Sequence, residues 1–393
     1  MGGRLLVFAT LLVMFLISGC VSEETPAMEI PEAAPPKIPE EQIEQTIEPE
    51  AGNADYPKIA SWLAKKDELI ASEKPFSLVM TAWFTPEEAD AFRAQNKDTK
   101  LLAGLTTNWI WDNEGWKTFL ETVSGNEIKE SMYLKNPNGT KCAFGWESEE
   151  WNHEEIYAMD PSSPEWRELI LSFYENVLDQ PQHDGIIVDM VVEKQWWCPE
   201  AISDEEWEEA TKEIFAELNE MNTEDKLIIF NAGLQFTDID AYAEYMDGYV
   251  LENFLGEWGA DYDTGLKAAD SDYIVIYAVD TDDTGIENMK RMRLGLTLSL
   301  LNDNTYFAYD FGPRDHGQAW WYPEYDVDLG EPLGDYYKKD NAYWREFENG
   351  LIVSSPYSDV NISFDEEYTD ATSGVTSKTF TVEKEDGRIF VKG

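Results

Sequence analysis

The feature that most constrains this chain is a short motif that occurs twice: an Asp-Gly pair, an apolar run and a carboxylate that ends the run. The first copy runs from Asp184 to Asp189 (DGIIVD) and the second from Asp247 to Glu252 (DGYVLE). A continuous apolar run is typical of a strand covered on both faces, as in a parallel sheet. Because such a core has no place for an unpaired charge, we expect each terminal carboxylate where its strand leaves the core. Taken singly, either could instead cap a helix or form an ion pair, but the matched pair favours a shared role.

From Pro57 onward, short β-rich runs alternate with amphipathic stretches of helical period, which indicates a parallel sheet with helices between its strands. Eight such units follow in order, so we predict an α/β fold, a (β/α)8 TIM barrel, over residues 57–350. Residues 351–393 are rich in Thr, Val and Phe, which predicts a small C-terminal antiparallel β module. A helix is expected over residues 58–72, before the first strand. The expected barrel strands are residues 76–84, 100–107, either 132–135 or 155–160, 183–190, 226–231, 247–252, 273–280 and 305–310.

The beginning of the chain has the pattern of an export signal. Arg4 gives a positive start, residues 5–17 are apolar, and Ser18-Gly19-Cys20 follows. This segment resembles a prokaryotic lipobox, so we predict a lipoprotein signal peptide over residues 1–20 with Cys20 as the lipidated residue. A plain secretory signal is the alternative. Residues 21–56 are rich in Glu, Pro and Ala and are expected to form a disordered acidic stalk. The expected location is extracytoplasmic, on the outer face of the cell membrane.

The chain carries 79 acidic against 29 basic residues, a formal net charge of -50. Nucleic acid would repel such a protein, so we exclude nucleic acid as a partner. A polyanionic substrate is disfavoured for the same reason, unless metal ions intervene. The oligomeric state is left open by the sequence.

Cys142 and Cys198 are the two cysteines left once Cys20 is set aside. Disulfides persist in exported proteins, and both residues fall in loops that follow expected strands. We therefore predict a disulfide between them, with two unrelated buried thiols as the alternative.

Asp189, Glu252 and Asp310 end the expected fourth, sixth and eighth strands. In a barrel of this type the inward side chains of alternate strands share one layer, and chemistry is done at the C-terminal ends of the strands. The carboxyl groups could then lie about 5 to 9 Å apart, the range over which pairs of carboxylates cleave glycosidic bonds. This range includes both retaining and inverting enzymes. We therefore predict Asp189 and Glu252 as catalytic residues.

Tryptophans are frequent in the loops after the expected strands, and an indole offers a flat apolar surface to a sugar ring. Buried core positions are the alternative for these tryptophans. Polar residues at the same strand ends are included with them as candidates. The predicted glycan-binding residues are Trp83, Asn108, Trp109, Trp196, Trp197, Asn231, Asp310, Arg314 and Trp320.

No metal or cofactor is expected. His153, His183 and His316 lie far apart in sequence and show no ligand spacing. Residues 280–283 (DTDD) lack the Gly and the terminal Glu of a calcium-binding loop, so a solvated helix N-terminus is expected there.

Four segments carry a resemblance to a known family: residues 184–189 (DGIIVD), 252–254 (ENF), 325–334 (YDVDLGEPLG) and 345–353 (REFENGLIV). Through them the barrel resembles hypothetical glycosyl hydrolase family fifteen, which is distinct from the glucoamylases. It is also similar to polygalactosaminidase-type and α-galactosidase-like barrels. The resemblance implies a nucleophilic carboxylate at the end of strand four and an acid/base carboxylate at the end of strand six. These positions are Asp189 and Glu252.

Together these features predict a surface-anchored glycoside hydrolase that cleaves a polysaccharide or glycan with two carboxylates, by a retaining mechanism. The alternatives are a non-catalytic carbohydrate-binding protein and a structural envelope protein. An enzyme needs both Asp189 and Glu252 in the mouth of the barrel, one of them with a raised pKa. We expect burial and the charge of Asp189 to raise the pKa of Glu252. Arg314 could instead pair with Glu252 and lower its pKa, which would leave Asp310 as the acid.

Overall fold

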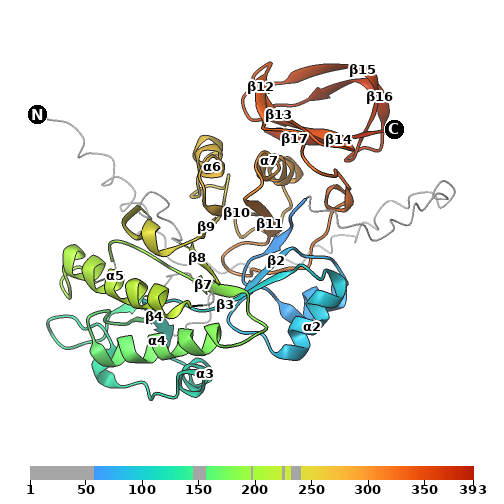
Figure 1. Ribbon diagram of the computed structural model, residues 1–393. Coiled ribbons are helices and arrows are strands. Elements are labelled where there is room, and N and C mark those ends of the chain that lie inside the picture. The colour runs from blue at the N-terminus through green and yellow to red at the C-terminus, as the bar shows by residue number, and fades with distance from the viewer. Residues whose placement is uncertain (1–56, 145–155, 196–197, 224–225, 232–239) are drawn as a thin grey trace, which may run out of the picture. The chain divides into compact units, whose positions relative to one another are not determined.

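Eight parallel strands form one sheet that nearly closes into a barrel, with helices around it (Figure 1). The computed structural model describes residues 57–144, 156–195, 198–223, 226–231 and 240–393. The predicted signal peptide, Cys20 and the stalk therefore lie outside the described residues. In sheet order the strands are β1 (Ala60–Ser61), β2 (Leu78–Thr81), β3 (Lys100–Ala103), β7 (Gly185–Val188), β8 (Leu227–Asn231), β9 (Gly248–Leu251), β10 (Ile274–Asp280) and β11 (Thr305–Asp310).

The first and last strands of this sheet meet. Ile59 pairs with Phe307 in a parallel bridge, and the N–H of Phe307 donates to the carbonyl of Lys58 at 3.0 Å. This contact brings the edges together, and the predicted (β/α)8 barrel is confirmed.

Two expected elements were wrong, and the errors compensate. Residues 58–72 do not form one helix, because β1 occupies its beginning and helix α1 covers only Lys66–Ser72. The third expected strand is not in the barrel. Ile156–Ala158 (β6) pairs instead with β4 (Trp109–Trp111) and β5 (Ala143–Phe144) in a separate antiparallel sheet. The prediction missed β1 and wrongly included a third strand, so the number of strands before β7 is unchanged. Asp189, Glu252 and Asp310 therefore still follow or end the fourth, sixth and eighth strands of the barrel.

The helices surround the barrel, and polar residues begin most of them. Ser203, for example, accepts the N–H of Glu206 while the Glu206 carboxylate accepts the N–H of Ser203, a reciprocal cap. The buried face of helix α4 (Pro164–Leu178) includes Trp166 and Phe173. The other described helices besides α1 are α2 (Pro86–Gln95), α3 (Glu114–Ser124), α5 (Asp204–Met221), α6 (Tyr262–Ala269) and α7 (Met289–Ser299), with short 3-10 helices at Glu130–Met132, Asp240–Tyr245 and Pro323–Asp326.

Side chains alternate between the barrel interior and the helical layer, as in any β-strand. The interior is filled by one apolar cluster: Ala60, Trp62, Leu78, Met80, Leu102, Ile187, Ile229, Val250, Ile276, Ala278, Tyr306 and Ala308. At the C-terminal ends of five strands, the next side chain to point inward, two residues after a member of this cluster, is polar. These side chains are Asp189, Asn231, Glu252, Asp280 and Asp310.

The Asp-Gly pair that opens the repeated motif has a structural role. Asp184 accepts the N–H of Leu101 at 2.8 Å, and Asp247 accepts the N–H of Ile228 at 2.7 Å. Each carboxylate thereby ties the start of its strand to the start of the preceding strand in the sheet. The glycine that follows lets the backbones approach closely, because a Cβ at Gly248 would lie 2.2 Å from a carbonyl oxygen.

The C-terminal module is a six-stranded antiparallel sheet that contacts α7. Within this contact, Arg293 of α7 forms a buried two-point ion pair with Asp386, at 2.8 and 2.9 Å. The sheet begins at Tyr337, so its first two strands fall within the range predicted for the barrel. In chain order the strands are β12 (Tyr337–Lys339), β13 (Ala342–Glu346), β14 (Gly350–Ser355), β15 (Val360–Asp370), β16 (Thr376–Val382) and β17 (Asp386–Lys392).

The predicted disulfide between Cys142 and Cys198 is confirmed, with the two Cα atoms 5.9 Å apart. It joins the small antiparallel sheet to the loop that follows β7. Leu134, Val192 and Trp207 pack around it in a buried apolar cluster. The bridge therefore anchors the loop that leads away from Asp189.

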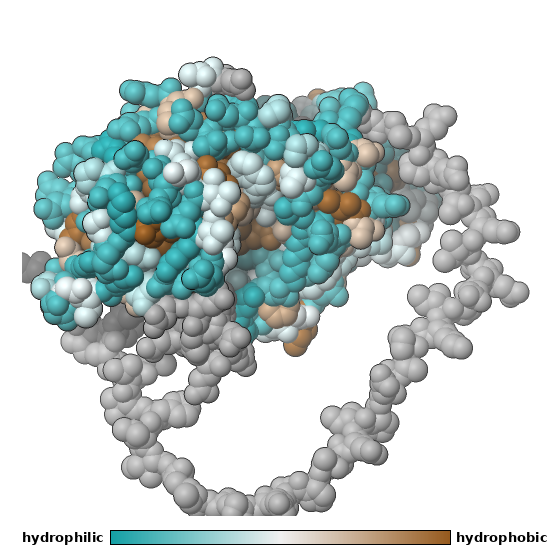
Figure 2. Space-filling model, turned by 90° about the horizontal axis from the view of Figure 1, so that it is seen from below, coloured by the Kyte–Doolittle hydropathy of each residue, from teal (hydrophilic) through white to brown (hydrophobic). Residues whose placement is uncertain are grey.

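The surface agrees with the acidic composition. Figure 2 shows one side of the molecule, on which hydrophilic residues cover most of the described surface and apolar residues form separate patches. Among the described helices, none has the length and apolar character that a membrane span requires.

Candidate active site

Asp189 follows β7 directly and continues its ladder, since its N–H donates to the carbonyl of Leu105 at 3.2 Å. The next residue, Met190, adopts a left-handed conformation with φ 54°, and its N–H donates to Asp189 Oδ1 at 2.9 Å. Asn108 holds this turn, because its Nδ2 donates to the Met190 carbonyl at 2.7 Å. Asn108 was predicted to bind glycan. It is fully buried, and its hydrogen bond fixes the turn that aims Asp189.

Asn231, the last residue of β8, joins the two predicted catalytic carboxylates. Its Nδ2 atom donates to Asp189 Oδ1 at 2.8 Å and to Glu252 Oε2 at 2.9 Å. Two oxygens bound to one nitrogen at these lengths are within about 6 Å of each other, near the separation of roughly 5 Å known from retaining pairs. Asn231 is itself fully buried, and its two hydrogen bonds position the pair.

His316 is a member of the site that the sequence analysis did not identify. Its Nε2 lies 3.2 Å from Glu252 Oε1 and its Nδ1 lies 3.0 Å from Asp310 Oδ2. Both neighbours are carboxylate oxygens, so a doubly protonated ring donates to each. Burial lowers the pKa of His316, but Asp310 and Glu252 outweigh burial and hold the pKa well above the ordinary 6.5. This setting favours the imidazolium form of the ring.

The pKa of Asp189 is shifted as well. Burial raises it from 3.8 to about 7, and the charge of Glu252 adds to the effect, against the hydrogen bond from Asn231. Asp189 therefore changes charge near neutral pH. A titrating carboxyl beside a second carboxylate is the arrangement from which acid/base chemistry is built.

Asp280 is a second residue that was missed in this layer. It ends β10, is 1% exposed and accepts hydrogen bonds from Asn253 Nδ2 at 2.6 Å and the N–H of Asp282 at 2.7 Å. Its other oxygen has no hydrogen-bond partner among the described residues. Burial raises the pKa of Asp280 to about 7. The expected solvated helix terminus is wrong for this residue, because it belongs to the barrel interior.

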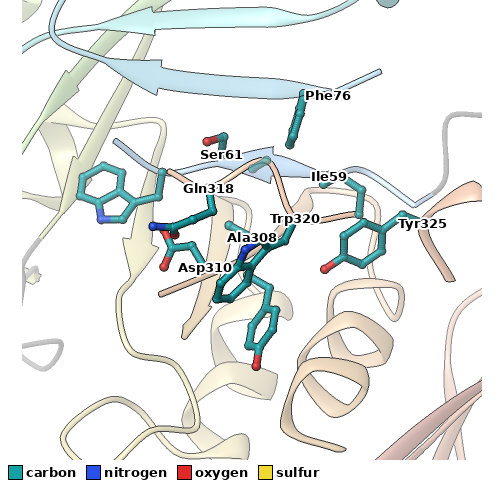
Figure 3. A pocket seen from close by; sticks show the side chains of 11 residues that line it. Ile59, Ser61, Phe76, Ala308, Asp310, Gln318, Trp320 and Tyr325 are labelled. Carbon is teal, nitrogen blue, oxygen red and sulfur yellow. The ribbon is translucent and has the colours of Figure 1, made fainter. Parts of the chain in front are cut away.

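A small pocket lies beside Asp310 where β1 meets β11 (Figure 3). Ser61, Ala308, Asp310 and Trp320 contribute to its lining. Its cavity volume of about 10 Å³ has room for about one water molecule. Trp320, predicted to bind glycan, packs against Tyr309 with ring centroids 5.7 Å apart. A sugar ring does not fit into this pocket.

The structure gives the contacts of three other predicted glycan-binding residues, Trp83, Trp109 and Arg314. Trp83 packs edge-on against His183, with centroids 4.9 Å apart, and against Phe119. Trp109 is buried in a cluster that includes Met190. Arg314 donates to the carbonyl of Asp283 at 2.7 Å and lies 3.6 Å from its carboxylate. Two further candidates, Trp196 and Trp197, lie outside the described residues.

The alternative in which Arg314 pairs with Glu252 is not what the structure shows: His316, two residues further along the same loop, lies against Glu252 at 3.2 Å. Within the described part of the chain, no group of three or more His, Cys, Asp or Glu side chains is arranged to hold a metal ion.

The fold and the strand-end side chains define the class: a (β/α)8 barrel with a carboxylate pair at the C-terminal mouth. Over residues 108–351, more than half of its length, the sequence matches Hypothetical glycosyl hydrolase family 15. The chain belongs to that family. The comparison with curated proteins gives no match.

Several solved structures are similar in fold. An α-amylase from Geobacillus thermoleovorans, complexed with acarbose, has 12% identity and a TM-score of 0.44, covering 83% of this chain and 90% of that one. The glycoside hydrolase domain of PelA from Pseudomonas aeruginosa has 13% identity and a TM-score of 0.43, covering 64% and 94%. A variant of the GH36 α-galactosidase AgaA from Geobacillus stearothermophilus has 12% identity and a TM-score of 0.47, covering 85% and 55%. Likenesses at this level are too distant to transfer an activity.

Proposed function

We propose that this protein hydrolyses the glycosidic bonds of a polysaccharide or glycan by a retaining mechanism, with Asp189 as nucleophile and Glu252 as general acid and base. The observation that carries the proposal is the shared contact to Asn231. It brings an oxygen of each carboxyl within about 6 Å of the other, whereas inverting enzymes separate their carboxyl groups by roughly 6.5 to 9.5 Å to admit a water. Family membership supports the reaction class.

In the first step Asp189 attacks the anomeric carbon while Glu252 gives a proton to the departing glycosidic oxygen. The product is a glycosyl ester on Asp189 and a free leaving group. In the second step Glu252 takes a proton from water, which attacks the same carbon and releases Asp189. Each step inverts the anomeric centre, so the overall configuration is retained.

Asn231 and the turn at Met190 prepare Asp189 for this role. Both donate to Asp189 Oδ1, at 2.8 and 2.9 Å, and such bonds stabilise the anion and fix its direction. Oδ2 is left as the atom that attacks. Because the pKa of Asp189 is about 7, the nucleophile becomes available as the pH rises through neutrality.

We also propose that the enzyme acts outside the cell, held at the membrane by a lipid on Cys20. The apolar run before Cys20 and the acidic, Pro-rich residues 21–56 support this location. Cys20→Ala should move the protein from the membrane fraction to the soluble fraction. Retention of Cys20→Ala in the membrane fraction would contradict the anchor.

The experiment is a glycan panel with two readouts. Released reducing ends identify a substrate, and proton NMR of the first product identifies its anomer before mutarotation. The proposal expects the substrate's anomeric configuration in the first product, and Asp189→Asn should abolish release. An inverted first product rules out the retaining mechanism. Binding without release by the wild type would favour a carbohydrate-binding protein.

A further inference from the structure

His316 lies outside the proposed catalytic pair and is nevertheless fixed against it. One ring nitrogen is 3.2 Å from Glu252 and the other is 3.0 Å from Asp310. The Asp310 oxygen that contacts the ring also accepts the N–H of Gly317 at 3.0 Å. Trp62 covers the ring from a third side in an edge-on contact, with centroids 6.0 Å apart. The side chain is 6% exposed, so the ring has little freedom to turn away from either carboxylate.

We propose that His316 is a positioning residue that holds the proton which Glu252 needs as an acid, and that Asp310 orients it. This inference rests on the proposed glycosidase function. In the resting protein, Nδ1–H donates to Asp310 and Nε2–H donates to Glu252. When a glycan fills the mouth, the Nε2 proton passes to Glu252 Oε1. Glu252 becomes a neutral carboxylic acid, and His316 becomes a neutral imidazole that still donates Nδ1–H to Asp310.

Desolvation provides the driving force. A sugar that displaces water from the mouth disfavours charged side chains, so the neutral pair of acid and imidazole gains over the ion pair. The same transfer removes two charges that act on the pKa of Asp189: that of Glu252, which raises it, and that of His316, which lowers it by less. Asp189 then ionises more readily. One proton movement therefore prepares Glu252 as the acid and Asp189 as the nucleophile.

The charged groups around the His316 ring determine the direction in which its pKa is shifted. Glu252 and Asp310 contact His316, while Asp189 and Asp280 interact with it through space. The adjacent Asp315 is paired with Lys65 at 2.5 Å. The four carboxylates of the mouth favour a protonated ring, and burial opposes it. Removing Asp310 should therefore lower the pKa of His316.

The first test needs no substrate. Histidine labelled with ¹³C at Cε1 is titrated by NMR in the full chain, and His316→Gln identifies the His316 signal. We expect its midpoint well above 6.5, and that of buried His183 below 6.5, because burial lowers the pKa of His183. Asp310→Asn should move the His316 midpoint downward. A His316 midpoint at or below 6.5 in the wild type overturns the proposal, whatever the activity.

The second test is kinetic and compares His316→Gln with His183→Gln, a buried histidine outside the mouth. Glutamine can donate a hydrogen bond to Glu252 but has no proton to transfer. We expect His316→Gln to lose about 100-fold in kcat/KM on a natural leaving group, much less on an activated one, and to lose the basic limb of the pH profile. His183→Gln should keep the pH profile.

Equal losses by His316→Gln on both leaving groups, with an unchanged pH profile, would make the ring merely structural and overturn the proposal. Thermal melts of His316→Gln and His183→Gln show whether a loss of activity comes from unfolding of the variant. If the wild type cleaves no glycan, the proposed function fails and the acid role fails with it. The NMR titration still decides the charge of His316 in that case, so the two failures are distinguishable.

Discussion

Two strands of the barrel carry a carboxylate at each end, and the two ends use it differently. At the N-terminal ends, Asp184 and Asp247 accept backbone N–H groups of the preceding strand at 2.8 and 2.7 Å. At the C-terminal ends, Asp189 and Glu252 share the amide of Asn231. The first pair aligns strands, whereas the second pair is assembled from side chains around the axis of the barrel.

The difference lies in what surrounds each carboxyl group. A backbone N–H is a fixed donor, so Asp184 and Asp247 stabilise the sheet by holding it in register. At the mouth, burial and a like-charged neighbour disfavour the anion and raise the pKa of Asp189 to about 7. A carboxylate therefore stabilises the fold at the N-terminal end of these strands and destabilises it at the C-terminal end. Such a loss of stability is typical of active sites. Substitutions at the two ends should separate stability from activity.

The largest expected effect is on turnover. Asp189→Asn keeps the acceptor for Asn231 and Met190 but cannot attack the anomeric carbon, so kcat should fall by on the order of a thousandfold or more, about 4 kcal/mol in the barrier. Asp184→Asn, at the other end of the same strand, is the matched control and should keep kcat within about threefold while it lowers Tm. Comparable rates for Asp189→Asn and wild type would remove Asp189 from the chemistry.

The second effect is on stability and depends on pH. The pKa of Asp189 is about 7 when folded and about 3.9 when unfolded, so its contribution to stability is full below pH 4 and is lost as the pH rises through 7. An asparagine side chain cannot ionise, so the Asp189→Asn variant should not lose this stability as the pH rises. It should be more stable than the wild type by on the order of 2–4 kcal/mol at pH 8, and about equal at pH 4. Chemical denaturation at both values measures this, and a variant less stable at pH 8 would contradict the account.

A smaller effect is expected where β9 begins. A Cβ at Gly248 would lie 2.2 Å from the Ile274 carbonyl oxygen, so the two strands must move apart. Gly248→Ala should cost about 1–3 kcal/mol in the free energy of unfolding. Gly115→Ala, whose added Cβ would meet its nearest neighbour at 3.4 Å, serves as the control and should be near neutral. Equal melting temperatures for the two variants would show that the strands can absorb the methyl group.

The smallest effect is expected from Asp247→Asn. The amide oxygen can still accept the N–H of Ile228, but the bond loses the charge that strengthens it. A loss of about 1 kcal/mol is expected, similar at pH 6 and pH 8, in contrast to the pH dependence at Asp189. A strong dependence between these two values would place Asp247 with the titrating groups.

Much of the fold could be predicted from the sequence because it follows from local patterns. The apolar runs with terminal carboxylates located β7 and β9, and the spacing of the units indicated the barrel. Strand β1 could not be predicted in this way, since only Ala60 and Ser61 form it and two residues show no period. Its pairing depends on the edges of the sheet meeting, which is a property of the whole barrel.

The site was only partly predictable for a similar reason. Asp189 and Glu252 follow strands directly, so strand ends revealed them. His316 reaches Glu252 through the conformation of a loop, and no sequence period encodes that contact. Asp280 could have been found, because it ends the seventh strand at an inward position. The partner of Asn108 could not be predicted either, because Asn108 donates to the backbone carbonyl of Met190, which is far away in sequence.

Asp189 and Glu252 are proposed to form a retaining catalytic pair, and trapping the covalent intermediate is the sharpest test of that pairing. Glu252→Gln should still be glycosylated by a substrate with an activated leaving group but should lack the base that releases the sugar. Peptide mass spectrometry of the quenched reaction should then find one glycosyl unit on the peptide that contains Asp189. An adduct on another carboxylate, or none while inverted product accumulates, would contradict the account.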